Sequence, residues 1–194
     1  MSSSITTCIN NYDKLLNAEY VFLIGRKNKT CELTIHFDKN DFFHLAGLHY
    51  LADLGQLHGS RETLYDSILT GSIAPQVIEE SIHYDSIKSR IDALSELPSL
   101  MESGKLVFRY NGSSSFFTKI IHDYLVEFTD KSPHRYLFLK EYADNFYHGI
   151  SFFPKYEKDY TLGETRWTLL KVTRNTMDSG STKSEVIYVS PSLK

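Results

Sequence analysis

The spacing of apolar residues changes once along the chain, near Gly104, and this change constrains the fold more than any other feature. Before Gly104, after an opening pair of strands, apolar residues recur at the three- and four-residue intervals of helices. After Gly104 they alternate with polar residues, as in half-buried strands. The pattern predicts an α+β fold, with helices over about residues 38–103 and a sheet over about residues 105–190.

The N-terminal part is predicted to open on a hairpin and to continue as helices. Tyr20–Gly25 and Glu32–Phe37 are rich in β-branched and aromatic residues and flank a basic turn. A helix is expected to begin at Asp41 after the cap Asn40 and to end near residues 55–59. Its apolar face would consist of Phe42, Leu45, Leu48, Leu51 and Ala52. Further helices are expected over residues 60–69, from Pro75, and over residues 84–97, where Pro98 ends the last one.

The C-terminal part is predicted to be a sheet. Asn111-Gly112 suits a two-residue hairpin turn, so Lys105–Tyr110 and Phe116–Ile121 are expected to pair. Further strands are expected over residues 124–129, 135–142, 146–153, 166–174 and 185–189. Short connections make neighbouring strands antiparallel. The predicted architecture is a single domain, residues 1–194, whose N-terminal hairpin and helices pack on a mainly antiparallel sheet of about four to six strands.

The charge excludes a globally polycationic nucleic-acid binder, because the net charge is −3 and the isoelectric point is near 6.2. Residues 1–104 hold 8 Lys and Arg against 14 Asp and Glu, a net −6, whereas residues 105–194 hold 13 against 10, a net +3. A weakly basic C-terminal half favours a local anionic ligand. Residues 1–7 lack the basic and apolar regions of a secretory signal, so the cytoplasm is the expected location.

The sequence indicates neither a metal nor a cofactor. Cys8 and Cys31 belong to no Cys-x-x-Cys pair and to no Cys/His metal spacing. The glycine-rich phosphate and dinucleotide motifs, Gly-x-Ser-x-Gly and His-Glu-x-x-His do not occur. His44 and His49 are five residues apart, which on a continuous helix turns their side chains about 140° away from each other. The two rings are therefore not expected to share a metal.

His44 is the first candidate for chemistry. It lies in the first turn of the helix expected from Asp41, where free backbone N–H groups and the helix dipole favour a neutral imidazole and attract phosphate. A neutral imidazole beside an anion site is suited to general base catalysis. The alternative interpretation is a partly buried helix residue that bonds to a neighbouring carbonyl.

Later strands supply the other candidates. Alternation places Ser151 on the face of Tyr147 and opposite to His148, unless a bulge at Gly149 changes the register. Ser151 is then either a phosphate contact or a close-packing position. Basic and aromatic residues of the strands fit a solvated face and a core, although one or two in a cleft would suit phosphate and bases. They are Arg135, Lys140, Arg166, Lys171, Arg174, Tyr156, Tyr160 and Trp167.

Two stretches resemble a known family. Residues 37–49, a strand followed by Phe-x-His-Leu-x-Gly-Leu, are similar to the opening motif of the phage-associated group-four nuclease domains. These domains belong to the barnase, EndoU, colicin and RelE-like (BECR) ribonuclease superfamily. Gly149–Pro154 and Asp159–Thr161 resemble the Ser-Phe-Phe and Asp-x-Tyr-Thr stretch of the same group. With the strand Tyr136–Lys140 between them, the resemblance spans roughly residues 20–175.

The resemblance implies a metal-independent endoribonuclease of the toxin or phage-conflict type, in which an RNA 2′-hydroxyl attacks the adjacent phosphate to leave a 2′,3′-cyclic phosphate. It implies that His44 is general base or acid, that Ser151 contacts the scissile phosphate, and that Lys140 or Arg135 stabilises its charge. Further substrate contacts are expected from Tyr147, Tyr160, Thr161 and Arg166. The expected partners are RNA and an inhibitor or immunity protein, with no membrane.

Two alternatives belong to other classes of function. A non-catalytic module of the same fold would bind protein or nucleic acid through exposed aromatic residues such as Trp167 or Tyr156, and replacing His44 would leave its function unchanged. A metal-dependent hydrolase is disfavoured because no ligand spacing supports it. Convergence of His44, Ser151 and an arginine or lysine at one place would favour the nuclease.

Overall fold

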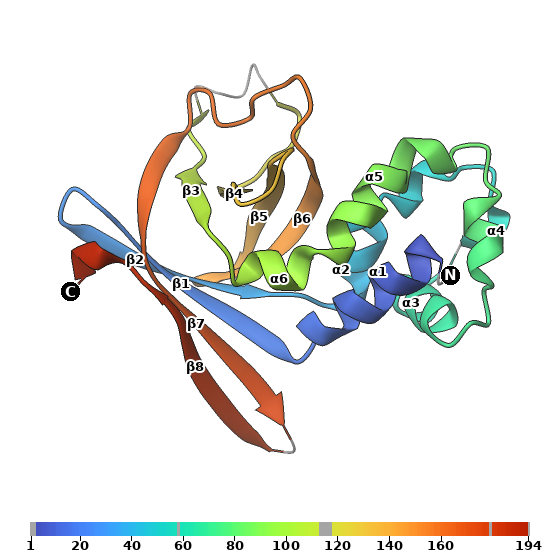
Figure 1. Ribbon diagram of the computed structural model, residues 1–194, viewed down its shortest axis with the longest axis horizontal. Coiled ribbons are helices and arrows are strands. Elements are labelled where there is room, and N and C mark those ends of the chain that lie inside the picture. Colours follow the sequence, from blue (N-terminus) through green and yellow to red (C-terminus); the bar gives the residue numbers. More distant parts are fainter. Residues whose placement is uncertain (1–2, 58, 113–117, 179, 194) are drawn as a thin grey trace.

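Figure 1 shows the computed structural model, which describes residues 3–57, 59–112, 118–178 and 180–193. The α-helices are α1 (Ser4–Tyr12), α2 (Lys39–Leu45), α3 (Arg61–Leu69), α4 (Pro75–Glu79), α5 (Tyr84–Ser95) and α6 (Leu97–Met101). The strands are β1 (Ala18–Arg26), β2 (Lys29–His36), β3 (Lys105–Arg109), β4 (Tyr124–Phe128), β5 (Arg135–Ala143), β6 (Phe146–Pro154), β7 (Thr165–Asp178) and β8 (Ser181–Val189). Short 3-10 turns are η1 (Asp13–Leu15), η2 (Leu48–Tyr50), η3 (Gly55–Leu57) and η5 (Pro191–Leu193).

The strands form one sheet in the order β1-β2-β6-β5-β4-β3-β7-β8. Because β1 also pairs with β7, seven strands close into a barrel-like ring, and β8 lies outside it beside β7. An α+β class fits this architecture, but the expectation of about four to six strands in an open sheet is wrong. The reason lies in β1, which is bonded along both edges: Phe22 faces Leu33 of β2 on one side and Val172 of β7 on the other. Of the described strand pairs, only β2 and β6 run parallel.

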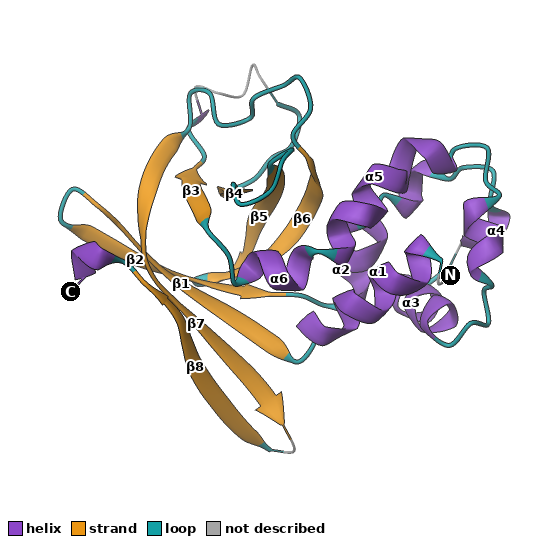
Figure 2. Cartoon of the chain, in the orientation of Figure 1, coloured by secondary structure: helices purple, strands orange, loops and turns teal. Residues whose placement is uncertain are grey.

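The helices gather on one side of the ring, as Figure 2 shows, and one hydrophobic core runs from them into the ring. In the helical part, the rings of Tyr12, Phe42 and Tyr65 pack with centroids 5.2–6.1 Å apart. A smaller apolar cluster covers the opposite, outer face of the strands β3 to β6. Its buried members are Phe108, Leu125, Tyr136, Phe138 and Phe153.

Helix limits differ from the expected ones where local caps decide them. Asp38, rather than Asn40, caps α2, because its carboxylate accepts a hydrogen bond from the backbone N–H of Asn40 at 2.6 Å. Pro98 lies in the first turn of α6 instead of ending a helix, a place where its missing N–H is not needed. The sequence reading also missed α1, although its buried residues follow helical spacing. They are Ile5, Cys8, Ile9 and Tyr12.

The hairpin expected around Asn111-Gly112 is also different in the structure. β3 pairs with β4, which begins at Tyr124, so the partner strand starts later than Phe116. Residues 113–117 lie outside the described part of the chain, and residues 118–121 form no strand. Among the described helices, none has both the length and the apolar character needed to cross a membrane.

Candidate functional site

Helices and sheet meet along one edge of β6. β2 pairs with β6 only from Phe146 to His148, and then β2 ends at His36 and the chain turns into α2. Past His148, α2 and α5 pack against β6 in place of a strand. Nη1 of Arg90, on α5, donates to the carbonyl oxygen of Phe152 at 3.4 Å. The two helices therefore bring their side chains beside the outer face of β6.

A capping box fixes the first turn of α2. The Asp38 carboxylate accepts from the backbone N–H of Asp41 at 3.2 Å, and the Asp41 carboxylate accepts from the N–H of Asp38 at 3.1 Å. The second oxygen of Asp41 lies 3.1 Å from Nδ1 of His148. This hydrogen bond raises the pKa of His148 above its usual value, although burial lowers it. Asp41 thus ties the start of α2 to the outer face of β6.

Gly47 brings His44 and His49 together. Its φ of +79° ends α2 early, and the turn η2 then places the ring of His49 4.9 Å from that of His44 between centroids. A Cβ at Gly47 would lie 3.0 Å from Cδ of Arg90 and 3.1 Å from Cγ2 of Ile87, so this backbone requires glycine. The expectation that the two histidines point apart is wrong, because it assumed a continuous helix. The expectation that His44 lies in the first turn of its helix is also wrong, because α2 ends at Leu45 and His44 belongs to its last turn.

Both imidazoles favour the neutral form. Burial, followed by the charge of Arg61, lowers the pKa of His44 below its usual value, against a smaller opposite effect of Asp41. Burial, followed by the charges of His44 and Arg90, lowers the pKa of His49. Because each protonated ring disfavours protonation of the other, the pair titrates as a coupled unit. A neutral base is therefore present near pH 7, and a singly protonated pair forms at lower pH.

Two arginines lie over aromatic rings that contact the paired imidazoles, since Phe43 packs on His44 and Tyr50 packs on His49. The guanidinium group of Arg90 lies over the ring of Phe153 at 4.9 Å and over that of Tyr50 at 5.4 Å. The guanidinium group of Arg61 lies over the ring of Phe43 at 5.7 Å. Aromatic faces thus hold both cations beside the imidazoles. We term the following four residues the histidine–arginine cluster: His44, His49, Arg61 and Arg90.

Sequence reasoning found only His44 among these four residues. His49 was set aside because Gly47 was not read as a helix end, although a glycine in that position is a common stop signal. Arg90 belongs to no motif, and its only signal is its spacing of three residues from Ile87, which places a cation beside the apolar face of α5. Arg61 carries no signal of its own in the sequence.

Ser151 shares the outer face of β6 with His148. Phe138 pairs with Ser151, whereas the next residue of β5 pairs with Gly149, so Ile150 is an extra residue in β6. This bulge is the register change that brings the serine and the histidine to one face. His148, Ser151 and Phe153 form a row on this face, which we term the row on β6. Asp41 contacts His148 at one end of the row, and Arg90 covers Phe153 at the other. Ser151 therefore lies on β6 between two contacts that α2 and α5 make.

Lys140 and Arg135 form ion pairs with residues outside the histidine–arginine cluster, although Lys140 is the cross-strand neighbour of His148. Nζ of Lys140 forms an ion pair with Asp123 at 3.1 Å, and Nη2 of Arg135 forms one with Glu96 at 3.3 Å. Alternation along β5 puts the two residues on opposite faces, and their separation of five residues corresponds to roughly 16 Å. They cannot both contact one phosphate in this arrangement, and a carboxylate already partners each of them.

Tyr147 and Arg166 are also placed apart from the cluster. Tyr147 points into the ring, is 3% exposed and packs against Tyr124 with centroids 5.4 Å apart. Arg166 is exposed on β7, opposite Phe108. Either way round the ring, at least three strand spacings separate β7 from β6, on the order of 14 Å along the curved sheet.

Tyr160 and Thr161 belong to the turn that follows β6. The N–H and hydroxyl groups of Thr161 donate to Oδ1 of Asp159 at 2.9 and 2.7 Å, and Nζ of Lys155 donates to Oδ2 at 2.8 Å. Burial raises the pKa of Asp159, but these hydrogen bonds lower it further than burial raises it. The ring of Tyr160 packs on Phe153 with centroids 5.5 Å apart. Tyr160 thus packs beside the side chain of Phe153, which Arg90 covers. The hydroxyl group of Thr161 is already bonded to Asp159 within the turn.

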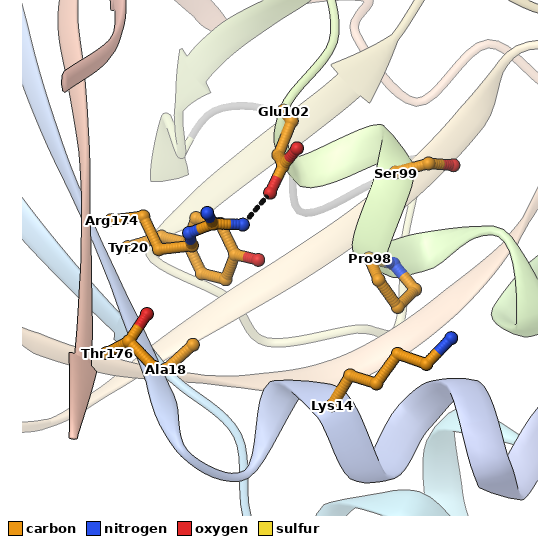
Figure 3. A pocket seen from close by; sticks show the side chains of 8 residues that line it. All are labelled: Lys14, Ala18, Tyr20, Pro98, Ser99, Glu102, Arg174 and Thr176. Carbon is orange, nitrogen blue, oxygen red and sulfur yellow. Dashed lines mark hydrogen bonds and ion pairs between the residues drawn. The ribbon is translucent and has the colours of Figure 1, made fainter. Parts of the chain in front are cut away.

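A cavity of about 410 Å³ lies elsewhere, where β1 and β7 meet α6 (Figure 3). Arg174 forms ion pairs there with Glu102 and, at 2.7 Å, with Glu185, so two carboxylates balance its charge. Of its lining residues, Arg174 was among the basic strand residues that would suit phosphate in a cleft, but these carboxylates already partner it. The lining residues are Lys14, Ala18, Tyr20, Pro98, Ser99, Glu102, Arg174 and Thr176.

Ligands for a metal ion are not grouped in the described part of the chain. No three His, Cys, Asp or Glu side chains lie together there in a way that could hold such an ion. The paired rings of His44 and His49 provide two nitrogen ligands, fewer than the three or four protein ligands of zinc sites.

One family of known proteins matches nearly the whole chain. A family model described as phage-Barnase-EndoU-ColicinE5/D-RelE like nuclease 4 matches residues 4–187. No curated protein and no solved structure matches. The matched range includes all four residues of the histidine–arginine cluster and the row on β6.

Proposed function

The chain belongs to the phage-Barnase-EndoU-ColicinE5/D-RelE like nuclease 4 family, and from this premise we propose that it cleaves RNA at the histidine–arginine cluster without a metal ion. One observation carries the proposal. The rings of His44 and His49 lie 4.9 Å apart, and burial together with the charges of Arg61 and Arg90 lowers the pKa values of both. Proton transfer to and from oxygen, together with charge stabilisation, is what metal-independent cleavage of a phosphodiester requires.

The proposed reaction is a transphosphorylation. The neutral imidazole of one histidine takes the proton of the RNA 2′-hydroxyl, whose oxygen attacks the adjacent phosphorus. The bond between phosphorus and the 5′-oxygen breaks, and the protonated second imidazole gives its proton to that oxygen. The products are a 2′,3′-cyclic phosphate and a 5′-hydroxyl group. Arg61 and Arg90 would stabilise the charge that develops on the phosphoryl oxygens, the part first assigned to Lys140 or Arg135.

Ser151 keeps a place in the proposed site, as a contact to the scissile phosphate. It lies in the row between His148 and Phe153, with its side chain on the outer face of β6. A hydroxyl group there can donate to a phosphoryl oxygen beside Arg90. Its expected contribution is smaller than that of the imidazoles, because one neutral hydrogen bond is worth less than a proton transfer.

The proposal is tested with the purified chain, residues 1–194, and several RNA pools in excess EDTA. We expect cleavage, and we expect every new end to be a 2′,3′-cyclic phosphate or a 5′-hydroxyl group. His83→Ala removes an exposed imidazole that does not belong to the cluster, at the start of α5, and serves as the matched control, with unchanged cleavage. Intact RNA at high protein concentration would contradict the proposal, as would cleavage that requires an added metal.

A toxin-type role in the cytoplasm is the biological setting that we propose for this activity. Unrestrained RNA cleavage would arrest growth, so an inhibitor or immunity protein that covers the histidine–arginine cluster would be needed in the producing cell. Arrest on induced expression, relieved when His44 is replaced by alanine, is the observation that would support this setting.

A further inference from the structure

We propose that a pocket beside Tyr156 binds one unpaired nucleoside of the RNA substrate, next to the histidine–arginine cluster. The inference rests on the proposed RNA cleavage but concerns a different place on the molecule. The pocket measures about 300 Å³, the lower end of ligand-site volumes, which suits one nucleoside rather than a larger ligand. Its lining residues are Ser132, Pro133, His134, Lys155 and Tyr156.

Tyr156 provides an aromatic wall that is both exposed and fixed. Its side chain is 60% exposed, an unusual position for so large a ring in a chain that buries most of its aromatic residues. Its hydroxyl group is hydrogen-bonded to Oγ of Ser89 on α5, which restrains the ring. A ring held at one end with its face open to solvent is suited to stacking with a base.

The floor of the pocket is polar but nearly balanced in charge. Nδ1 of His134 lies 2.8 Å from Oε1 of Glu127, a carboxylate that is buried behind the pocket. Lys155 lies 3.5 Å from the same carboxylate and 2.8 Å from Asp159. The carboxylates of Glu127 and Asp159 thus offset the charge of the lysine. This balance argues against a phosphate ligand and favours a neutral group with hydrogen-bonding edges, such as a nucleobase.

His134 keeps one ring nitrogen for a ligand. Glu127 holds Nδ1, and among the described residues Nε2 of His134 has no hydrogen-bond partner. Because the buried carboxylate fixes the ring, Nε2 is presented at the pocket without further loss of side-chain freedom. It can donate to or accept from the edge of a base, according to its tautomer.

The pocket and the histidine–arginine cluster are joined through α5. Ser89 contacts Tyr156, and the next residue of the helix, Arg90, covers Phe153. Phe153 and Tyr156 are separated by only two residues at the end of β6. An RNA strand whose phosphate lies at Arg90 would therefore bring a neighbouring nucleoside to Tyr156.

Binding of an uncleavable RNA tests this inference. The probe is a short single strand with 2′-O-methyl riboses, which lack the attacking hydroxyl group, and its affinity is measured by fluorescence anisotropy. We expect Tyr156→Ala to weaken binding about 5- to 100-fold, the range of one lost base stack. His134→Ala, which leaves the ring of Tyr156 in place, is expected to weaken it about 2- to 10-fold.

Matched variants and an abasic probe separate stacking from a general loss of structure. Tyr156→Phe keeps the ring and should bind within about twofold of the original chain. Tyr188→Ala removes another exposed tyrosine, on β8, and should not change binding. When one nucleoside after another of the probe is replaced by an abasic unit, one position should erase the difference between Tyr156→Ala and the original chain.

The outcomes distinguish this inference from the proposed activity. Equal affinity of Tyr156→Ala and the original chain would overturn the pocket and leave cleavage in EDTA as a separate result. Equal weakening on every abasic probe would also overturn it, because no particular base would then be recognised. Weaker binding by Tyr156→Ala in a chain that cleaves no RNA would support the pocket and contradict the proposed reaction.

Discussion

Replacement of either His44 or His49 by alanine is expected to slow RNA cleavage by about 100- to 10,000-fold, the usual contribution of one acid–base group. The two effects should not multiply in the double variant, because the two rings act as base and acid of the same reaction step. Single-turnover cleavage of a defined RNA in EDTA measures these rates. The control His83→Ala should cleave at the rate of the original chain, and all variants should unfold within a few degrees of it.

The pH dependence follows from the lowered pKa values of the two histidines. Cleavage requires one neutral and one protonated imidazole, so the rate should pass through a maximum. Because burial and nearby cations hold both pKa values below the ordinary 6.5, the maximum should lie on the acidic side of pH 6.5. A rate that rises steadily up to pH 9, or one that His49→Ala leaves unchanged, would remove His49 from the proposed mechanism.

Lys105→Met is expected to stabilise the chain by about 1–3 kcal/mol at pH 7. Lys105 is 7% exposed and lies inside the closed sheet. Its Nζ is 5.1 Å from the centre of the aromatic ring of Phe22 and 6.0 Å from that of Phe128. Burial lowers its pKa from 10.5 to about 8, against the opposite effects of Asp130 and Glu102. Methionine keeps the shape and removes the cost of burying a charge.

The sign of the pH effect follows from the same shift. Below pH 8 the lysine is protonated in both the folded and the unfolded chain, and between about pH 8 and 10.5 only the unfolded chain keeps the proton. The free energy of unfolding therefore rises with pH in this window, and the advantage of Lys105→Met should shrink. Urea unfolding at several pH values measures the free energy of unfolding of both chains. The effects of tyrosine titration are the same in both chains and cancel in the difference.

Lys105 also makes a hydrogen bond that stabilises the folded chain, and the loss of this bond could make Lys105→Met destabilising. Nζ donates to the carbonyl oxygen of Met101 at the end of α6, at 2.5 Å. If this bond contributes more than burial costs, Lys105→Met will unfold more easily than the original chain at every pH. Lys105→Gln retains a donor without the charge and should then recover part of the loss, so the two explanations can be told apart.

Local features of the fold could be predicted from the sequence. The alternating residues of β1 and β2 and the apolar spacing of α3, between Ser60 and Gly71, identify these elements within a few residues. Closure of the ring could not be predicted, because it depends on the pairing of β1 with β7. An alternating strand has the same pattern in an open and in a closed sheet. The distant pairing adds no local signal, so the sheet was expected to be smaller than it is.

The candidate site was predictable only in part, for a similar reason. His44 and Ser151 could both be chosen because family-like stretches contain them. The separate argument for His44, a place in the first turn of its helix, is wrong because α2 ends at Leu45 and puts His44 in its last turn. His49 depends on the positive φ of Gly47, and the common face of Ser151 and His148 depends on one extra residue in β6. Such single-residue changes of geometry reverse the direction of a side chain without changing the average pattern.

The most direct test of the proposed reaction uses a DNA strand that contains one ribonucleotide, incubated with the chain in EDTA. Attack by a 2′-hydroxyl group can occur at only one phosphate of this strand. We predict a single cut on the 3′ side of the ribonucleotide, with a 2′,3′-cyclic phosphate end, and no cut by His44→Ala. Cuts at deoxynucleotides, or an equal rate when the ribonucleotide carries a 2′-O-methyl group, would contradict the reaction proposed for the histidine–arginine cluster.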